Sequence, residues 1–133
     1  MTNSFAEFSR AKMILAIGTN TTAAHPAAAS SVKNATANGA QLIVVDPRRS
    51  GLADFATLHV PIRVGSDIAF LNGVMNVLIT ENLYDREYVE TCCTGFEALR
   101  AKVLEYPPER SAEICGIEAD TIREVARQLA AVK

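Results

Sequence analysis

Two short apolar runs on either side of an alanine-rich segment constrain the fold of this chain most. Residues 13–17 and 42–45 are continuously apolar, which is typical of parallel strands covered on both faces. Pro26 suits the first turn of a helix, and Gly39 suits the left-handed position after its end. We therefore predict a helix over residues 26–38 that connects two parallel strands.

A third strand and a long helix are predicted next along the chain. Residues 58–62 form a short β-prone run, and Pro61 makes it an edge strand or a very short one. Ser66 is a good N-cap for a helix that ends near Asn82. The apolar side chains that recur at helical spacing in this helix, and that we expect to face the core, are Ile68, Leu71, Met75, Leu78 and Ile79.

The last third of the chain indicates a helical lobe. Short amphipathic helices are expected near 85–91 and 96–104, and the Tyr-Pro-Pro sequence at 106–108 cannot continue a helix. A final amphipathic helix carries Ile122, Val125, Ala126, Leu129 and Val132 on one face. The sequence thus predicts an α/β fold with about three parallel strands, in which residues 1–133 are a single domain.

Composition excludes several classes of partner. The formal net charge is −2 and the basic residues are scattered, so nucleic acid and anionic membranes are not expected partners. No apolar run approaches the roughly 20 residues that span a bilayer, and the first residues do not resemble a signal peptide. These features favour a cytoplasmic location. The three cysteines lack the spacing of a metal site or disulfide framework, which favours reduced, partly buried thiols: Cys92, Cys93 and Cys115.

The polar residues that could bind a ligand follow the predicted strands. Gly18–Thr22 leaves the first strand, where a small residue and a helix N-terminus favour an anionic group such as phosphate, although a plain strand-to-helix turn explains the segment nearly as well. Asp46 ends the second strand, where a carboxylate can accept hydrogen bonds from ribose hydroxyls. The alternative role of Asp46 is to cap a turn. In open parallel sheets, ligands bind beyond this carboxyl edge.

Three further groups of residues each have more than one possible role. Arg48 and Arg49 can clamp a phosphate or stack on a base, and Arg49 suits a solvated surface equally well. In Gly65-Ser66-Asp67, a carboxylate can accept the two N–H groups of guanine, or the segment is simply a helix start. His25 and His59 fit loop packing and a hydrogen-bonded strand histidine better than catalysis.

Motifs along nearly the whole chain resemble the molybdopterin oxidoreductase family, and within it the catalytic alpha subunits of formate dehydrogenases. The order and spacing of the motifs are more specific than any one of them. They are Met1–Ser4, Ile17–Asn20 with His25-Pro26, Val44–Arg49, Gly65–Asp67, Leu71–Gly73, Asn82–Asp85, Thr94–Glu97, Tyr106–Glu109 and Ile114–Gly116.

The resemblance implies a Rossmann-like, three-layer domain that is an internal fragment of a larger subunit. In this family, such a domain holds one of two molybdopterin guanine dinucleotides that ligate molybdenum or tungsten. By analogy, the cofactor-binding residues are Gly18 and Asn20 on the phosphate or pterin side, Asp46, Pro47 and Arg48 at the guanosine end, and Gly65, Ser66 and Asp67 at the guanine.

The resemblance also implies what the chain lacks. The family's metal ligand and iron–sulfur cysteines lie upstream of this region, so no catalytic or metal-binding residue is assigned here. The parent enzyme would oxidise formate to carbon dioxide and would pair with its remaining domains and electron-transfer subunits. Two alternatives stay open: a free-standing regulatory module for NAD or a guanine nucleotide, and a folded piece whose exposed apolar face favours self-association.

Overall fold

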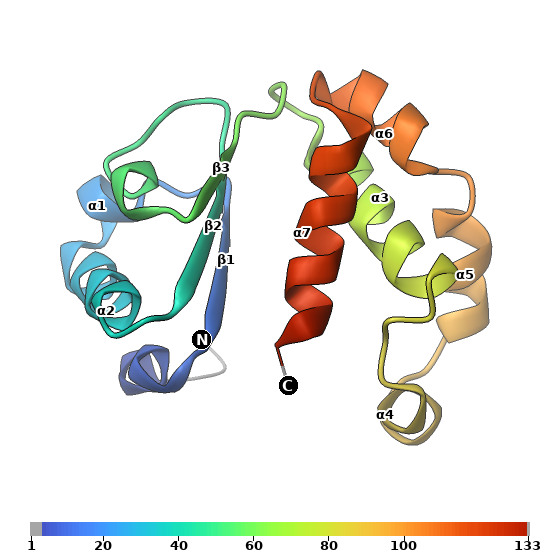
Figure 1. Ribbon diagram of the computed structural model, residues 1–133, viewed down its shortest axis with the longest axis horizontal. Coiled ribbons are helices and arrows are strands. Elements are labelled where there is room, and N and C mark those ends of the chain that lie inside the picture. The colour runs from blue at the N-terminus through green and yellow to red at the C-terminus, as the bar shows by residue number, and fades with distance from the viewer. Residues whose placement is uncertain (1–3, 133) are drawn as a thin grey trace. The chain divides into compact units, whose positions relative to one another are not determined.

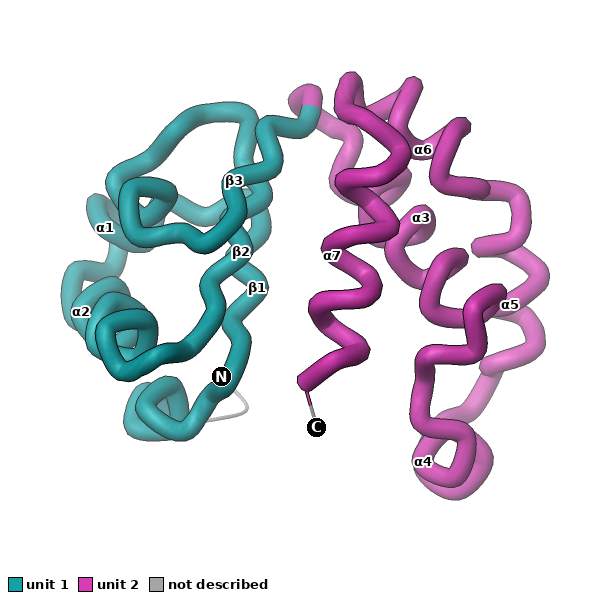
Figure 2. The backbone as a smooth tube through the Cα atoms, in the orientation of Figure 1, with its two compact units in different colours: residues 1–62 teal, residues 63–133 magenta. Residues whose placement is uncertain are grey.

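The computed structural model describes residues 4–132, and the chain divides into two compact units, residues 1–62 and 63–133 (Figure 2). The first contains a parallel sheet of three strands, β1 (Met13–Ile17), β2 (Gln41–Val45) and β3 (Leu58–Val60), in the order β1-β2-β3 (Figure 1). This confirms the predicted parallel sheet, and β1 has the predicted bounds.

The register places the ends of all three strands at one edge of the sheet. Ile17 pairs with Val45, and Val45 pairs with Val60, so the last residues of β1, β2 and β3 are aligned. Pro61 follows directly after β3, and its missing N–H explains why this edge strand ends there rather than at Ile62. The polar segments that follow β1 and β2 therefore leave the sheet side by side.

The helix α2 (Pro26–Ala37) packs on one face of this sheet. Val32 joins Leu42 and Val44 of β2 in a buried apolar cluster, as the small side chains of the helix predict. Gly39 adopts the left-handed conformation expected after the helix, with φ 98°. Three short helical turns complete the unit: η1 (Phe5–Arg10), α1 (Thr21–Ala24) and η2 (Ala53–Phe55).

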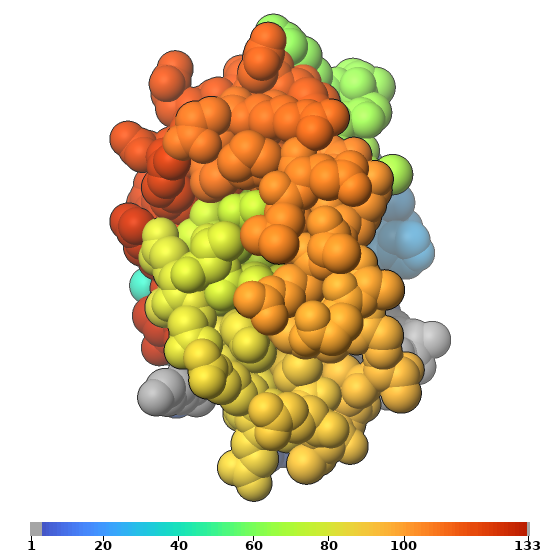
Figure 3. Space-filling view, turned by 90° about the vertical axis from the view of Figure 1, so that its right-hand side faces the viewer, coloured from blue at the N-terminus to red at the C-terminus, as the bar shows by residue number. Residues whose placement is uncertain are grey.

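The second unit is helical. Its elements are α3 (Asp67–Thr80), α4 (Arg86–Cys92), α5 (Phe96–Val103), α6 (Pro108–Cys115) and α7 (Ala119–Ala131). α3 packs against α5, α6 and α7, and α7 buries Ile122, Val125 and Ala126 as predicted. The close approach of α3 and α6 depends on Gly73, because a Cβ there would lie 2.7 Å from the Cβ of Ser111. Figure 3 shows α4 and α5, yellow to orange, at the surface of this unit.

One prediction for the helical unit was wrong, and one helix was missed. The buried residues of α3 are Ala69, Phe70, Gly73, Val74, Asn76 and Val77, whereas Ile68 is 72% exposed and Leu71 37%. α3 is apolar almost all round, so spacing alone does not identify the face that packs. The predicted break at Tyr-Pro-Pro is confirmed, because it separates α5 from α6. The helix α6 was not predicted; Pro108 is its first residue, where the missing N–H of proline is tolerated.

Polar contacts that were not predicted from the sequence link the helices of the second unit. The Arg127 guanidinium makes two hydrogen bonds to the carboxylate of Glu81 at the end of α3, at 3.0 and 2.7 Å. Asn76 is buried in α3, and its side-chain amide donates to the carbonyl of Val103 at 2.9 Å. Buried amides are retained only where such partners exist. Within the part of the chain that the structure describes, no helix is long and apolar enough to span a membrane.

Candidate functional site

The carboxyl edge of the sheet in the first unit brings two of the predicted segments together. Gly18 follows β1 and Asp46 follows β2, and the Gly18 N–H donates to the carbonyl of Val45 at 2.9 Å. Gly18 is exposed and has φ 58°, a conformation that favours glycine. This part of the edge therefore offers an open backbone surface beside a carboxylate.

Asp46 is held firmly at this edge. It is only 6% exposed, and its Oδ1 accepts the backbone N–H of Arg48 at 2.8 Å. Its carbonyl oxygen lies 3.0 Å from Nε2 of His59 on β3, so His59 is the hydrogen-bonded strand histidine that was expected. The turn-capping alternative for Asp46 is thus realised in the structure. This role uses only Oδ1 of the carboxylate. The second carboxylate oxygen makes no hydrogen bond within residues 4–132 and can accept one from a ligand.

The segment after β1 contacts the segment after β2. Asn20 is exposed, and its Oδ1 accepts a hydrogen bond from Thr22 Oγ1 at 3.1 Å. A Cβ on Gly51 would lie 3.3 Å from the same Thr22 oxygen, so the segment 46–52 folds against this loop. The expected helix N-terminus is weaker than predicted, because α1 has four residues and α2 starts only at Pro26. A single turn contributes little helix dipole.

The arginines after β2 differ in their surroundings. Pro47, Arg48 and Arg49 are exposed. The Arg49 guanidinium is paired with Asp54 at 3.2 Å, with both side chains about two-thirds exposed, which is the solvated surface alternative. The Arg48 guanidinium makes no hydrogen bond or ion pair within the described residues. Arg48 is therefore the cation at this edge that is available to a phosphate.

Gly65, Ser66 and Asp67 belong to the second unit. Gly65 has φ 80°, and a Cβ there would meet nothing within 4 Å, so the space around it is open. Ser66 occupies the N-cap position of α3 and is 4% exposed, but its hydroxyl does not cap the helix. Instead it donates to the carbonyl of Arg63 at 2.6 Å, which corrects the capping prediction. Asp67 is the first residue of α3, and its carboxylate makes no hydrogen bond within residues 4–132.

The cysteines do not form a cluster. Cys92 and Cys93 are exposed rather than partly buried, and Cys115 is buried. The Cys115 thiol donates to the carbonyl of Ser66 at 3.6 Å, and burial raises the pKa of this thiol. Among the described residues, no group of three or more His, Cys, Asp and Glu side chains is arranged to hold a metal ion.

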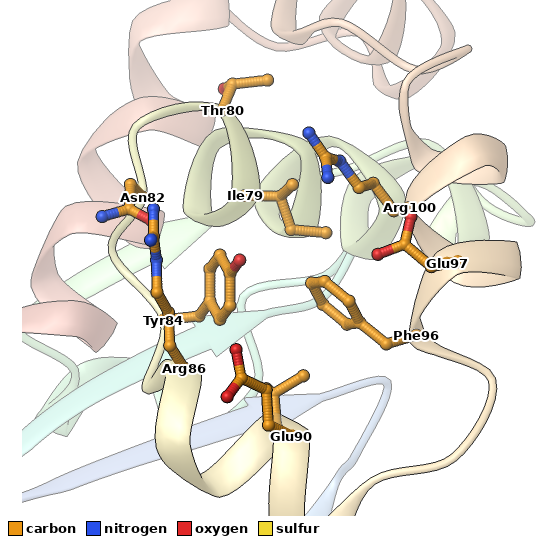
Figure 4. Close-up of a pocket in the computed structure, with 10 residues that line it drawn as sticks. Ile79, Thr80, Asn82, Tyr84, Arg86, Glu90, Phe96, Glu97 and Arg100 are labelled. Carbon is orange, nitrogen blue, oxygen red and sulfur yellow. The ribbon is translucent and has the colours of Figure 1, made fainter.

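Two features were not anticipated from the sequence. The Oγ of Ser50, in the segment after β2, is buried and has no hydrogen-bond partner among the described residues. The Ser-Gly pair at 50–51 signals a turn, but nothing in it signals this burial. A cavity of about 450 Å³ also lies between the end of α3, α4 and α5 (Figure 4). Its lining comes from three separate segments, which no local motif could reveal.

The predicted site residues thus fall into two groups. The structure brings Gly18, Asn20, Asp46, Pro47 and Arg48 to one edge of the first unit, and it places Gly65, Ser66 and Asp67 together in the second. A buried carboxylate with a free oxygen, an unpaired guanidinium and an open glycine backbone fit a ligand with ribose and phosphate groups. The assignment of these residues to a cofactor stays a prediction.

Comparisons with known proteins agree with the resemblance. The chain is 40% identical over its whole length to formate dehydrogenase H of Escherichia coli, 19% of which it covers. It is 43% identical to acetylene hydratase of Syntrophotalea acetylenica, with 92% of the chain and 17% of that protein covered. A nitrate reductase of Symbiobacterium thermophilum is 37% identical over 86% of the chain and 17% of its own length.

A solved structure and a family model match the chain over nearly its whole length. The solved structure of acetylene hydratase from Pelobacter acetylenicus matches 98% of the chain with a TM-score of 0.88 at 40% identity, and the match covers 18% of that structure. The chain therefore spans about a fifth of the length of these relatives. The family model for molybdopterin oxidoreductase matches residues 1–129. The chain belongs to the molybdopterin oxidoreductase family, whose members use a molybdopterin cofactor.

Proposed function

We propose that this chain binds and positions one molybdopterin guanine dinucleotide. The observation that carries this proposal is the position of two residues at the carboxyl edge of β1 and β2: the buried Asp46 carboxylate and the exposed Gly18 in the left-handed conformation. In parallel sheets, this edge is where nucleotides bind. The proposal includes a single cofactor-binding domain of Rossmann-like type over residues 1–133.

The role of each residue in the first unit follows from its contacts. The free oxygen of Asp46 accepts hydrogen bonds from ribose hydroxyls, while its other oxygen keeps the turn to Arg48 closed. The unpaired Arg48 guanidinium binds a phosphate. Gly18 allows close approach of the ligand, Asn20 lies beside it, and Pro47 fixes the backbone between Asp46 and Arg48.

Selection of guanine is assigned to the second group of residues. The Asp67 carboxylate can accept both the N1–H and the exocyclic amino group of guanine, which adenine cannot offer together. Gly65 leaves the space beside this carboxylate open. Ser66 holds the turn through its bond to Arg63 and thereby positions Asp67 at the start of α3.

The enzyme that contains this domain is proposed to be a formate dehydrogenase that produces carbon dioxide. Several of the similar proteins are formate dehydrogenases, including an F420-dependent enzyme of Methanocaldococcus jannaschii that is 39% identical over 96% of the chain. When bound, the cofactor would supply a molybdenum or tungsten centre for two-electron chemistry. The residues described here only bind and orient it, so the chain alone is expected to be inactive.

The proposed partners and location follow from this assignment. The remaining domains of the same subunit would complete the cofactor site, and electron-transfer subunits would carry electrons away. The compartment proposed for the enzyme is the cytoplasm.

Calorimetric titration of the purified chain with GDP, GMP and NAD tests the proposal. We expect selective binding of the guanine nucleotides, and loss of the preference in Asp67→Ala. Asp120→Ala is a matched control, because Asp120 also lies in the first turn of a helix, α7. A preference for NAD would favour the free-standing module. Absence of binding to all three nucleotides would contradict a self-sufficient site.

A further inference from the structure

The cavity beside α4 and α5 is a second candidate binding site, separate from the proposed cofactor residues. Its apolar wall is formed by Ile79, Tyr84 and Phe96, and charged side chains surround this wall (Figure 4). The rings of Tyr84 and Phe96 lie 5.2 Å apart and are tilted by 41°. The volume of about 450 Å³ is in the range of pockets that take small molecules.

An apolar groove continues from this wall. It shares Ile79, Tyr84, Val89 and Phe96 with the cavity and adds Met75, Leu78 and Leu99, with a volume of about 310 Å³. Leu99 is 41% exposed. A ligand seated against Tyr84 and Phe96 can therefore extend an apolar group along this groove, where burial of its surface would contribute to binding.

The charged side chains around the cavity carry both signs. Arg86 is already engaged, because its Nε donates to Asn82 Oδ1 at 2.7 Å. The side chains of Glu90, Glu97 and Arg100 make no hydrogen bond or ion pair within residues 4–132. In Figure 4 the Glu90 carboxylate lies beside the ring of Tyr84.

Opposite charges line this cavity without being paired to each other. Glu97 and Arg100 are about one helical turn apart on α5, and both line the cavity. A ligand with only one charge would leave either the carboxylates or the guanidinium without a partner. A zwitterion would engage both.

We propose that this cavity binds an α-amino acid with a large apolar side chain. Its ammonium group would contact Glu90 and Glu97, its carboxylate would contact Arg100, and its side chain would lie against Tyr84 and Phe96. Hydrogen bonds between charged groups are the strongest contacts available at such a site. This inference does not depend on the cofactor assignment, because none of its residues belongs to the cofactor groups.

Titration of the chain with L-phenylalanine, phenethylamine and 3-phenylpropanoate tests the proposal, since the second probe lacks the carboxylate and the third lacks the ammonium. We expect L-phenylalanine to bind about tenfold or more tightly than either, the effect of one charged hydrogen bond. Arg100→Gln should weaken L-phenylalanine but not phenethylamine. Glu90→Gln should weaken L-phenylalanine but not 3-phenylpropanoate.

Two variants serve as matched controls. Lys102→Gln removes a positive charge from α5, and Glu87→Gln removes a negative charge from α4, but neither residue lines the cavity. All four positions are exposed, so the variants are expected to fold. Equal affinity for the three probes, equal loss in the control variants, or no binding at about 10 mM ligand would overturn the proposal.

Discussion

Substitution of Gly73 by alanine tests the close packing of α3 on α6. A Cβ at this position would lie 2.7 Å from both the Cβ and the Oγ of Ser111, and 3.3 Å from Cγ2 of Ile122. Ser111 is fully buried, and its Cβ is fixed to the helix backbone, so the two helices must move apart. Overpacking of this severity costs about 2–3 kcal/mol, whereas alanine gains about 1 kcal/mol over glycine in a helix interior.

The expected net result for Gly73→Ala is destabilisation by about 1–2 kcal/mol, measured as the free energy of unfolding in urea. Ser111→Gly removes both clashing atoms. In that background, Gly73→Ala should cost far less and should stabilise the chain by up to about 1 kcal/mol, because the clash with Ser111 is gone and only the 3.3 Å contact with Ile122 opposes the helix propensity of alanine. This relief of the penalty is the critical result. If Gly73→Ala has the same effect with and without Ser111, the steric argument is refuted.

Three further predictions concern the helical unit. The Arg127 guanidinium holds the pKa of Glu81 below its usual value of 4.5, so the pair stabilises the folded state above pH 4.5 and loses this effect as the pH falls lower. The difference in Tm between the chain and Arg127→Met should therefore shrink in acid. A difference in Tm that stays constant with pH would contradict the pairing. Cys115 is buried, so a thiol reagent should modify Cys92 and Cys93 in the folded chain and should reach Cys115 only in denaturant. Equal modification rates for all three cysteines would contradict the burial of Cys115. Asp85→Ala should lower the free energy of unfolding in urea by about 1 kcal/mol, because the Asp85 side chain accepts the Tyr88 N–H at 3.0 Å at the start of α4. Asp85→Asn keeps an oxygen that can accept this bond and should lower the free energy of unfolding much less.

The sheet was predictable because its signals are local. Continuous apolar runs, with a proline as the first residue of the connecting helix and a glycine after it, are enough to define β1, α2 and β2. Pro61 likewise indicated a short edge strand, which β3 is. The carboxyl edge followed from the parallel order, so the approach of Gly18 to Asp46 could be predicted as well.

The remaining features depend on contacts that the spacing and propensity of the residues do not specify. The face of α3 that packs is selected by the small residue Gly73 opposite Ser111, and this pairing is not visible in the spacing of α3. The role of Ser66 changed for a similar reason, since its hydroxyl found the carbonyl of Arg63 within the preceding turn. The lining of the second cavity comes from three segments, so only the folded chain shows it.

The hydrogen bond between His59 and Asp46 fixes which nitrogen of the imidazole carries a hydrogen. A carbonyl oxygen can only accept, so Nε2 of His59 must carry the hydrogen in this contact. The edge strand β3 therefore holds the backbone of Asp46 from both sides of the residue: its Val60 carbonyl accepts the Asp46 N–H at 3.2 Å, and its His59 side chain donates to the Asp46 carbonyl. The position of the Asp46 carboxylate thus depends on the shortest strand of the sheet as well as on the turn that follows β2.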